Sequence, residues 1–342
     1  MVTMKDVADR AHVSIATVSF VVNGTKRVTE ATRERVETAM RELGFARNPI
    51  GAALARGRTR ILAMLFPALE RPLSLTASAF FTSASRRARQ RGYDLVMWPI
   101  GNDAEQIAVL ARSGLVDGAL LMEVQLNDPR VAALVEHDVE FAMIGRTADP
   151  SALPYVDIDM SSSVDAAYAQ LTAEGHEDIA FLASASPAYD HALVWRAMRA
   201  YREVTERNGH PTTLIACGGM PGDGRRIGER FATDYPDTTA VIILNEHAAP
   251  GLVAGLTHAG LDVPADVSLI SLGSSAYMAE MTEPQLTYMR TPGTELGELG
   301  LDALVDRLED TQGPLPQVLL PCELVPGGTV AAAGPRRTPR RA

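Results

Sequence analysis

The stretch at residues 13–24, V-S-I-A-T-V-S-F-V-V-N-G, carries small and hydroxylic side chains where a surface helix usually carries Glu and Lys. Ser14, Thr17 and Ser19 offer hydroxyl groups that donate and accept hydrogen bonds. Ile15 and Ala16 offer apolar groups that suit thymine methyls. Short side chains let a helix approach base edges and phosphates closely, so the stretch favours a helix that reads the major groove of DNA. A helix packed on the body of the protein is the alternative, because it would also tolerate small residues.

Capping signals predict the helices that would position this face. Polar N-caps and left-handed C-terminal residues set helix limits. The predicted limits are Thr3 to His12, Ser14 to Gly24, and Thr29 to Gly44. Two short helices separated by about three residues form a helix-turn-helix, and the third helix would close a small core.

Residues 48–60, N-P-I-G-A-A-L-A-R-G-R-T-R, predict a further short helix with Asn48 as its N-cap and Gly57 beyond its end. About two turns are too few to be stable alone in water. The minor groove of DNA is one partner that would fold this helix, with Leu54 wedged between base steps and Arg56 against a phosphate. A flexible linker is the alternative, and it describes the free protein in either case.

Charge is divided unevenly along the chain. Residues 1–60 contain 11 Lys and Arg against 6 Asp and Glu, whereas the whole chain has a net charge of −10. A cationic segment on an anionic body suits nucleic-acid binding through the first sixty residues. The last residues, R-R-T-P-R-R-A, form a second basic cluster, and we expect a disordered basic tail over 331–342.

The composition indicates a soluble globular protein of two or three units. Its 342 residues exceed one typical core, and 46% of them are hydrophobic. No apolar run reaches the roughly 18 residues that span a bilayer, and the N-terminus is charged where a signal peptide is apolar, so we expect a cytoplasmic location. Cys217 and Cys322 form no C-x-x-C pair, which argues against a disulfide framework or a zinc site, and we expect no cofactor.

Apolar segments alternate with helical segments from residue 61 onward. The first series contains I-L-A-M-L-F, Y-D-L-V-M-W, V-D-G-A-L-L-M and E-F-A-M-I, and a second series from Asp159 contains I-A-F-L-A, T-L-I-A-C, A-V-I-I-L and V-S-L-I-S. Such repeated β-α-β units form parallel sheets. Two series predict two lobes that face a cleft, with a ligand at the carboxyl ends of the strands.

Several motifs carry a family resemblance through nearly the whole chain. In the first part these are V-S-I-A-T-V-S, V-V-N-G, E-L-G-F and N-P-I-G-A-A-L; in the body they are L-T-A-E-G-H-E-D-I-A-F-L, G-L-D-V-P-A-D-V-S-L-I and E-P-Q-L-T-Y-M-R. Together they resemble the LacI (lactose-repressor) family of bacterial transcription regulators. The resemblance implies an all-α helix-turn-helix head at 1–46, a hinge helix at 47–60, and a two-lobed, periplasmic-binding-protein-like effector-binding and dimerisation core at 61–330. It also implies that the segment near 291–312 crosses back to the first lobe.

Two residues of the head depart from the family pattern. His12 stands in the inter-helix turn where the family usually has Gly, and His tolerates the left-handed backbone there at some cost. Phe20 stands where the family commonly has Arg, and Phe cannot donate to guanine. We therefore expect operator preference to depend on methyl contacts and on DNA deformability. The DNA-contacting residues are expected to be Thr3, Ser14, Ile15, Ala16, Thr17, Ser19, Phe20, Asn23, Thr29, Asn48, Leu54 and Arg56.

The resemblance also implies where an effector would bind. The expected effector-binding residues are Leu73, Ser74, Asp159, Trp195, Arg196, Asn245, Glu246 and Ser274. The sugar-binding pattern of the family is half present: Met160 replaces Asn, Gly273 and Ser274 replace two Asp, and the expected Arg falls on Ala197 or, with a shift of one residue, on Arg196. A polyhydroxyl ligand needs paired acceptors, so these changes favour a more apolar ligand or a degraded site. The alternative is that these are simply core residues.

Motifs for enzyme classes are missing from the sequence. G-D-G-R-R-I lacks the third Gly of a dinucleotide fingerprint, and neither G-x-S-x-G nor H-E-x-x-H occurs. We therefore expect a non-enzymatic, dimeric transcriptional repressor that binds a palindromic DNA operator and is controlled by a small molecule in the cleft. Because no leucine heptads follow residue 330, a tetramer built on a C-terminal coiled coil is not expected. A small-molecule binding protein with a vestigial head, and an enzyme on the same lobes, are the alternatives.

Overall fold

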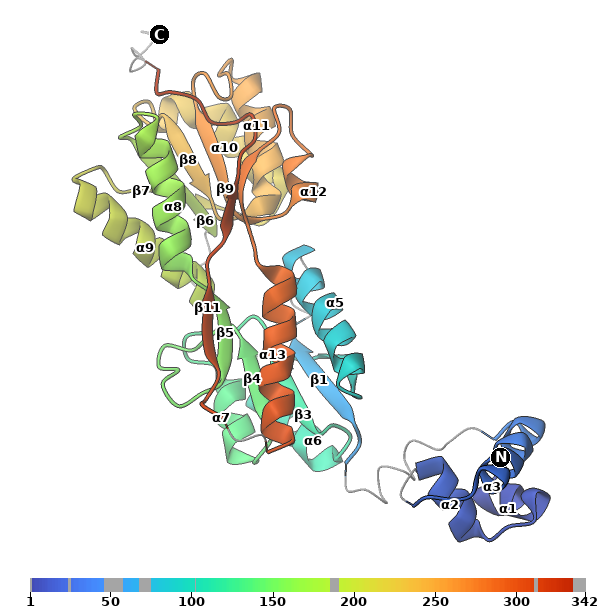
Figure 1. Cartoon of the computed structure of the whole chain (residues 1–342). Coiled ribbons are helices and arrows are strands. Elements are labelled where there is room, and N and C mark those ends of the chain that lie inside the picture. The colour runs from blue at the N-terminus through green and yellow to red at the C-terminus, as the bar shows by residue number, and fades with distance from the viewer. Residues whose placement is uncertain are drawn as a thin grey trace. The chain divides into compact units, whose positions relative to one another are not determined.

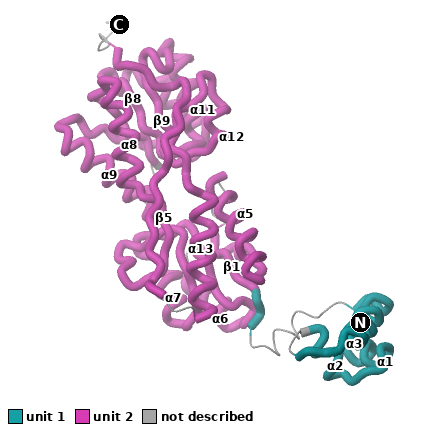
Figure 2. Tube along the Cα trace, viewed as in Figure 1, with its two compact units in different colours: residues 1–60 teal, residues 61–342 magenta. Residues whose placement is uncertain are grey.

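The computed structural model (Figure 1) describes residues 2–23, 26–45, 58–67, 75–101, 103–184, 191–310 and 313–334. The chain divides into two compact units, residues 1–60 and residues 61–342 (Figure 2). Each unit is described by itself below. In these ranges no helix is both long enough and apolar enough to cross a bilayer.

The first unit is a helical head with a small core. Its helices are α1 (Met4–Ala11), α2 (Ile15–Asn23) and α3 (Glu30–Leu43). The buried side chains that hold the three helices together are Val7, Ala8, Ala11, Val18, Val36 and Ala39. The predicted helix-turn-helix is confirmed, since the polar N-caps and the left-handed C-terminal residues set the helix limits as expected. The predicted hinge helix at 47–60 lies mostly outside the described residues.

The first lobe of the second unit is built on a six-stranded parallel sheet with the order β11-β5-β4-β3-β1-β2. Its strands are β1 (Ile61–Phe66), β2 (Asp94–Pro99), β3 (Gly118–Leu121), β4 (Phe141–Ile144), β5 (Tyr155–Ile158) and β11 (Gln317–Leu320). Its helices are α5 (Leu75–Gln90), α6 (Ala104–Ser113), α7 (Pro129–Glu136) and α13 (Gly293–Leu308).

The second lobe repeats this plan on a sheet with the order β12-β10-β9-β8-β6-β7. Its strands are β6 (Ile179–Ser184), β7 (Thr213–Cys217), β8 (Ala240–Ile243), β9 (Ser268–Ser274), β10 (Thr287–Arg290) and β12 (Glu323–Val325). Its helices are α8 (Met160–Ala173), α9 (Ala192–Asn208), α10 (Pro221–Asp234), the short η1 (Glu246–Ala248), α11 (Ala249–His258) and α12 (Ala276–Ala279).

The eight predicted strands are confirmed, and the prediction missed four others. Strands β5, β10, β11 and β12 have only three or four residues each. Two of them, β11 and β12, lie at sheet edges and are partly exposed, so their sequences lack a long apolar run. The predicted parallel sheets are confirmed, and the missed strand β12 pairs antiparallel with β10 at the edge of the second sheet.

Both faces of each sheet are covered by helices, which explains why the central strands are apolar throughout. In β1, Leu62 and Met64 belong to the core beneath α5 and α13, whereas Ala63 and Leu65 belong to the core beneath α6 and α7. The alternation follows from the period of two residues in a strand. The second sheet is covered in the same way, by α8 and α9 on one face and by α10 and α11 on the other.

The two lobes share one chain that passes between them repeatedly. Within the described ranges it passes from β5 to α8, from β10 to α13, and from β11 to β12 (Figure 1). The expected return of the segment near 291–312 to the first lobe is confirmed, because α13 packs against α5. The two helices approach closely at Gly297, where a Cβ atom would lie 2.6 Å from the Phe80 carbonyl oxygen. Any larger side chain at that position would push the helices apart.

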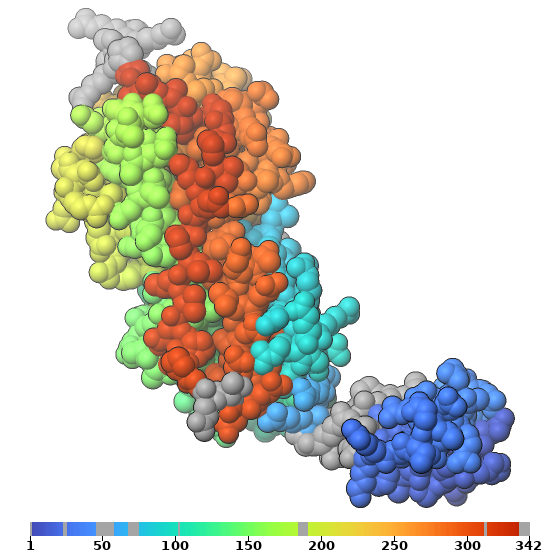
Figure 3. Space-filling view, in the orientation of Figure 1, coloured from blue at the N-terminus to red at the C-terminus, as the bar shows by residue number. Residues whose placement is uncertain are grey.

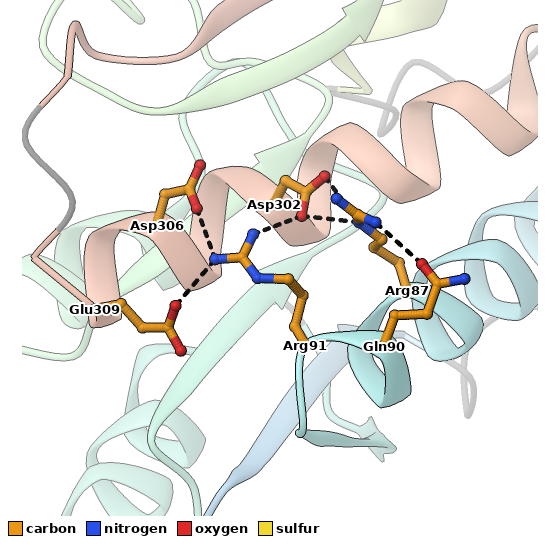
Figure 4. Close-up of polar contacts among 6 residues, drawn as sticks. All are labelled: Arg87, Gln90, Arg91, Asp302, Asp306 and Glu309. Carbon is orange, nitrogen blue, oxygen red and sulfur yellow. Dashed lines mark hydrogen bonds and ion pairs between the residues drawn. The ribbon is translucent and has the colours of Figure 1, made fainter.

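A cluster of charged side chains joins α5 to α13 across this contact (Figure 4). Asp302 accepts hydrogen bonds from Arg87 Nε at 2.9 Å and from Arg91 Nη1 at 2.8 Å. Arg91 also donates to Asp306 at 2.8 Å and to Glu309 at 3.0 Å. Asp302 and Arg91 are only 24% and 22% exposed, so water screens their attraction less than it screens a surface pair.

The C-terminal segment lies on the surface of the second lobe beside α8 (Figure 3). The Ala333 backbone N–H donates to the Glu174 carbonyl at 2.7 Å, and the Ala331 N–H donates to Ser268 Oγ at 3.1 Å. Residues 331–334 therefore belong to this lobe, and the predicted start of a disordered tail at 331 is too early. Residues 335–342 lie outside the described part of the chain.

Replacing Asp302 should weaken the packing of α13 on α5. Asp302→Asn removes one charge that two guanidinium groups share, so we expect the free energy of unfolding of the core to fall by about 1–2 kcal/mol. Urea unfolding followed by circular dichroism measures this loss. Glu298→Gln on the same helix is the matched control. Its carboxylate lies 4.0 Å from Arg86 and is exposed, so a change of about 0.5 kcal/mol or less is expected. Equal losses in the two variants would contradict the role of the cluster.

Candidate functional site

The head begins with a reciprocal cap at Thr3. The Asp6 N–H donates to Thr3 Oγ1 at 3.3 Å, and the Thr3 N–H donates to Asp6 Oδ2 at 2.8 Å. The Thr3 hydroxyl also donates to Asp6 Oδ2 at 2.8 Å, and the two hydrogen bonds that Thr3 donates to this carboxylate lower the pKa of Asp6. The Thr3 side chain is exposed, and it is hydrogen-bonded within this cap. Any contact of Thr3 with DNA would therefore be made at the N-terminal end of α1.

The turn between α1 and α2 has the left-handed backbone expected at His12, with a φ of 53°. The Val13 N–H donates to the Ala8 carbonyl at 3.0 Å, which closes the end of α1. Ser14 then caps α2, since its Oγ accepts from the Thr17 N–H at 3.1 Å and lies 2.9 Å from Thr17 Oγ1. The turn and the cap together fix the direction of α2 relative to α1.

The outer face of α2 has the small, bare surface that the sequence predicts. Val18 is buried in the core of the head, whereas Ser14, Ile15 and Ala16 are exposed. Ile15 is 50% exposed, so an apolar group is available on this face. Thr17, Ser19 and Phe20 are half-buried at the edges of this face.

Two predicted DNA-contacting residues have additional partners within the head. The Lys26 ammonium lies 5.1 Å from the centre of the Phe20 ring, so Phe20 holds a cation close to α2 although it has no donor of its own. Thr29 occupies the N-cap of α3, but its hydroxyl lies 2.8 Å from the Thr32 hydroxyl instead of bonding a backbone N–H. Thr29 is therefore the N-cap residue of α3, as predicted, but its side chain makes no hydrogen bond to the backbone at the helix end.

Several predicted site residues cannot be placed. Asn23 is the last residue of α2, and its side chain is not described. The residues that lie outside the described part of the chain are Asn48, Leu54, Arg56, Leu73 and Ser74.

A cavity of about 310 Å³ lies between the two lobes of the second unit. Ile158 lines it from the end of β5, and Glu123 from the segment after β3. From the second lobe, Asn245 and Glu246 follow β8, and Gly273 lies near the end of β9. The strand order reverses beside β1 in the first lobe and beside β6 in the second. Open α/β sheets bind ligands at such reversals. The volume suits a small molecule.

Three of the predicted effector-binding residues meet at this cavity. Asn245 and Glu246 line it directly, and Ser274 donates from Oγ to Glu246 Oε2 at 3.2 Å. Asn245 donates from Nδ2 to the Gly218 carbonyl at 2.6 Å. Glu246 is only 7% exposed, and this burial raises the pKa of its carboxyl group. The second-lobe wall of the cavity therefore carries a desolvated acid.

Glu123 and His191 form a polar contact across the lobes that the sequence analysis missed. His191 precedes α9 in the second lobe, and its Nε2 lies 2.7 Å from Glu123 Oε2 of the first lobe. Residue 125 forms a β-bridge with His191, and the Ala192 N–H donates to the Val124 carbonyl at 3.2 Å. The position of Glu123 directly after an apolar strand was a usable signal, since strand ends line such clefts. His191 carried no comparable signal.

A buried ion pair supports the segment that presents Glu123. Arg130 is fully buried, and its Nη2 donates to Asp128 at 2.7 Å. The same nitrogen donates to the carbonyls of Met122 at 3.0 Å and Glu123 at 3.1 Å. Glu123 has a left-handed backbone with a φ of 53°, so these bonds help to hold a conformation that Glu rarely adopts.

The other three placed residues do not line the cavity. Asp159 caps α8 through its side chain, accepting from the Ser162 N–H at 3.1 Å. Trp195 is 44% exposed and stacks with Arg199 at 5.4 Å, on a separate groove. Arg196 donates to the carbonyls of Arg146 and Thr147 at 3.0 and 2.7 Å. None of these three side chains is among the residues that line the cavity, and Arg196 lines an adjoining pocket instead.

Arg196 belongs instead to a charge cluster in an adjoining pocket of about 50 Å³. Its Nη1 lies 3.9 Å from Asp157 Oδ2, and Arg146 Nε lies 3.2 Å from the same oxygen. Burial raises the pKa of Asp157 to about 6, against the opposing effect of the two arginines. Two guanidinium groups thus face one buried carboxyl group in this pocket.

Comparison with known proteins gives matches along nearly the whole chain. Residues 3–48 match the model described as bacterial regulatory proteins, lacI family, and residues 168–330 match a periplasmic binding protein-like domain. The chain is 30% identical over 332 residues to the HTH-type transcriptional regulator CelR of Thermobifida fusca, covering 93% of this chain and 95% of CelR. It is 29% identical over 324 residues to the ribose operon repressor of Escherichia coli strain K12, covering 93% of this chain and 96% of that repressor.

A solved structure also matches the fold. The crystal structure of the lac repressor dimer bound to operator and the anti-inducer ONPF has a TM-score of 0.86 at 23% identity, covering 97% of this chain and 99% of that one. At this level of identity the likeness concerns the arrangement of helices and strands. It agrees with the helical head and the two-lobed core described above.

Relieving the backbone at His12 should stabilise the head. His12→Gly removes the steric cost of a left-handed Cβ, so we expect local stability to rise by about 0.5–1 kcal/mol, although Gly also gains entropy in the unfolded chain. Amide hydrogen exchange of α1 and α2 in the full chain measures this gain as slower exchange. His12→Ala is the control, because it removes the imidazole and keeps the Cβ. Equal protection in the two variants would show that the φ angle is not the cause.

Proposed function

The chain belongs to the LacI family of bacterial regulatory proteins, and from this membership we propose that it is a transcriptional repressor that binds a palindromic operator as a homodimer. The single observation that carries the proposal is the bare outer face of α2 on a compact helix-turn-helix. A two-fold symmetric dimer would place one such helix in each half-site, so that the operator mirrors the symmetry of the protein. Such a repressor acts where the chromosome is, in the cytoplasm.

In this proposal the residues of the head divide into two groups. Base edges would be met by Ser14, Ile15, Ala16, Thr17 and Ser19, whose side chains are short or apolar. Phosphates would be met by the ends of the helices. The remaining head residues proposed to lie at the DNA are Thr3, Phe20, Asn23 and Thr29. Lys26 above the Phe20 ring would add a phosphate contact where an Arg is lacking.

The hinge proposal concerns residues that the structure does not describe. Asn48 would cap a helix that folds in the minor groove, with Leu54 as its wedge and Arg56 against a phosphate. The helix is too short to be stable without a partner, so its folding would depend on DNA and on a second copy of the chain. The hinge would thus be the bistable element of the repressor.

The cavity between the lobes is the proposed effector site. A ligand there would contact Glu123 and Ile158 in the first lobe and Asn245 and Glu246 in the second. It would therefore favour one angle between the lobes over others, and this difference in binding free energy is what couples the effector to the hinge. Among the similar proteins are a ribose operon repressor and a lac repressor dimer that is bound to operator and to the anti-inducer ONPF.

Selection of bound duplexes from a random DNA library tests the proposal directly. The full-length protein is used at near-physiological salt, where non-specific phosphate binding is weak. The expected result is enrichment of a palindrome whose half-sites are set one helical turn apart and whose centre is deformable. Failure to enrich any sequence, with and without pooled metabolites, would favour the alternative of a small-molecule binding protein with a vestigial head.

Ile15 gives a sharper test of base reading. Ile15→Ser removes an exposed apolar group, so the stability of the head should be unchanged, while affinity for the selected operator should fall about three- to tenfold. Deoxyuridine in place of thymidine at the contacted position should weaken the wild type by a similar factor and leave Ile15→Ser unaffected. Fluorescence anisotropy measures both. Val109→Ser, which removes an exposed apolar side chain from the second unit, is the control and should bind the operator as the wild type does. Equal sensitivity to deoxyuridine in the wild type and in Ile15→Ser would refute the methyl contact.

A further inference from the structure

We propose that the compound bound between the lobes carries a protonated amine on an apolar body. The proposal rests on the proposed function only in taking the 310 Å³ cavity as the effector site. It goes further by naming the chemical class of the effector from the groups that line the cavity. A simple sugar is the contrasting class, because it offers several hydroxyl groups and no charge.

The acidic side chains in the described lining of the cavity are not matched by Lys or Arg. Among its described lining residues the ionisable side chains are Glu123, Glu246, His191 and His247, and neither Lys nor Arg occurs among them. Glu123 has a partner in His191 across the lobes. Glu246 is attracted electrostatically by its neighbour His247, but the described lining gives it no ion pair like that of Glu123 with His191.

Glu246 is in the environment where a cation would be bound most strongly. It is buried, and its hydrogen bond from Ser274 Oγ is long, at 3.2 Å. Burial disfavours the ionised form, which agrees with the raised pKa of this carboxyl group. An ammonium group of a ligand would supply both the opposite charge and a hydrogen bond in a site with little water.

The remaining polar groups of the lining can both donate and accept hydrogen bonds. Asn245 uses one N–H of its Nδ2 on the Gly218 carbonyl and keeps a second N–H and its accepting oxygen. The hydroxyl-bearing residues Thr76 and Thr291 also line the cavity. The position where the resemblance expects an Arg is Ala197, which is fully buried, and Arg196 is committed to two backbone carbonyls. A sugar oxygen therefore lacks the guanidinium donor that family members use, whereas an amine does not need one.

The arginines of the adjoining pocket do not change this balance. Arg146 lies 3.2 Å and Arg196 3.9 Å from Asp157, a buried carboxylate. Asp157 offsets one of these two positive charges, and neither guanidinium lines the cavity that holds Glu246. An anionic ligand in that cavity would be repelled by Glu246.

The rest of the wall is apolar and suits a hydrocarbon body. Its side chains come from both lobes and from the segment that links them. They are Phe80, Met160, Leu193, Val194, Leu244 and Leu272. Their burial against a ligand would favour binding in proportion to the apolar area removed from water, and an ammonium beside Phe80 would also be attracted to the ring face. The cavity therefore pairs an acidic end with an apolar body.

Matched sets of small molecules test the proposal with the full-length protein. One set is cyclohexylmethylamine, cyclohexylmethanol and cyclohexanecarboxylate; a second is 2-phenylethylamine, 2-phenylethanol and phenylacetate; ribose and cellobiose represent sugars. Calorimetry at neutral pH should give an amine affinity at least tenfold above that of the alcohol in one set or both, with the carboxylate weakest. The same amines should raise the midpoint of thermal unfolding, since a ligand that binds only the folded state stabilises it.

Glu246→Gln removes the charge and keeps the shape of the side chain. We expect it to lower the affinity for the amine at least tenfold and to leave that for the alcohol unchanged, and unchanged alcohol binding also shows that the variant is folded. Glu295→Gln, an acid that lines a neighbouring pocket on α13, is the matched control and should bind amine as the wild type does. If Glu246→Gln does not fold, the difference in affinity between amine and alcohol in the wild type still tests the proposal.

The proposal is overturned if alcohols, carboxylates or sugars bind as tightly as the amines, or if no amine in either set binds. These outcomes are separate from the failure of the proposed function. Loss of sequence-selective DNA binding with amine binding intact would refute the repressor and leave the ligand class standing. Operator binding that responds to a sugar and not to an amine would refute the ligand class alone.

Discussion

The organisation of the core depends on one constraint: parallel strands must be joined by crossovers, so all their carboxyl ends lie at the same edge of a sheet. Both lobes obey it, with the same reversal of strand order beside β1 and beside β6. The segments that follow β3 and β8 therefore face each other across the lobes, and they bring Glu123, Asn245 and Glu246 to one cavity. Helices cover both faces of each sheet, which leaves the strand ends as the natural place for polar groups.

The two lobes are held together by covalent passages and by a few polar contacts. The chain passes between them from β5, β10 and β11 within the described ranges, and such passages limit how far the lobes can separate. Near the cavity, Glu123 meets His191, and Arg196 reaches the carbonyls of residues 146 and 147. A change in the angle between the lobes would rearrange these polar contacts and also the apolar cluster that contains residues of both lobes.

The head and the core show two different uses of side-chain size and charge. In the head, the proposed contact with DNA requires a helix face without long side chains, and α2 exposes short ones. The caps at Thr3 and Ser14 fix the ends of α1 and α2. In the core, the candidate site requires enclosure, so the buried Asp128–Arg130 pair holds the backbone of Glu123 in place. A buried ion pair is weak evidence for stability, but here it orients a segment that lines the cavity.

The sequence alone determined the elements whose signals lie in residues close together along the chain. Caps, left-handed turns and apolar runs set the helices of the head and the eight longer or more central strands, because the signals for these elements lie within a few residues. The pairing of Glu123 with His191 could not be predicted, since the two residues lie 68 positions apart and meet only when the lobes fold together. The positions of Trp195 and Arg196 outside the cavity were likewise decided by the tertiary structure. Strands β11 and β12 also needed tertiary structure, because short, partly exposed edge strands form only where a neighbouring strand offers free hydrogen-bonding groups.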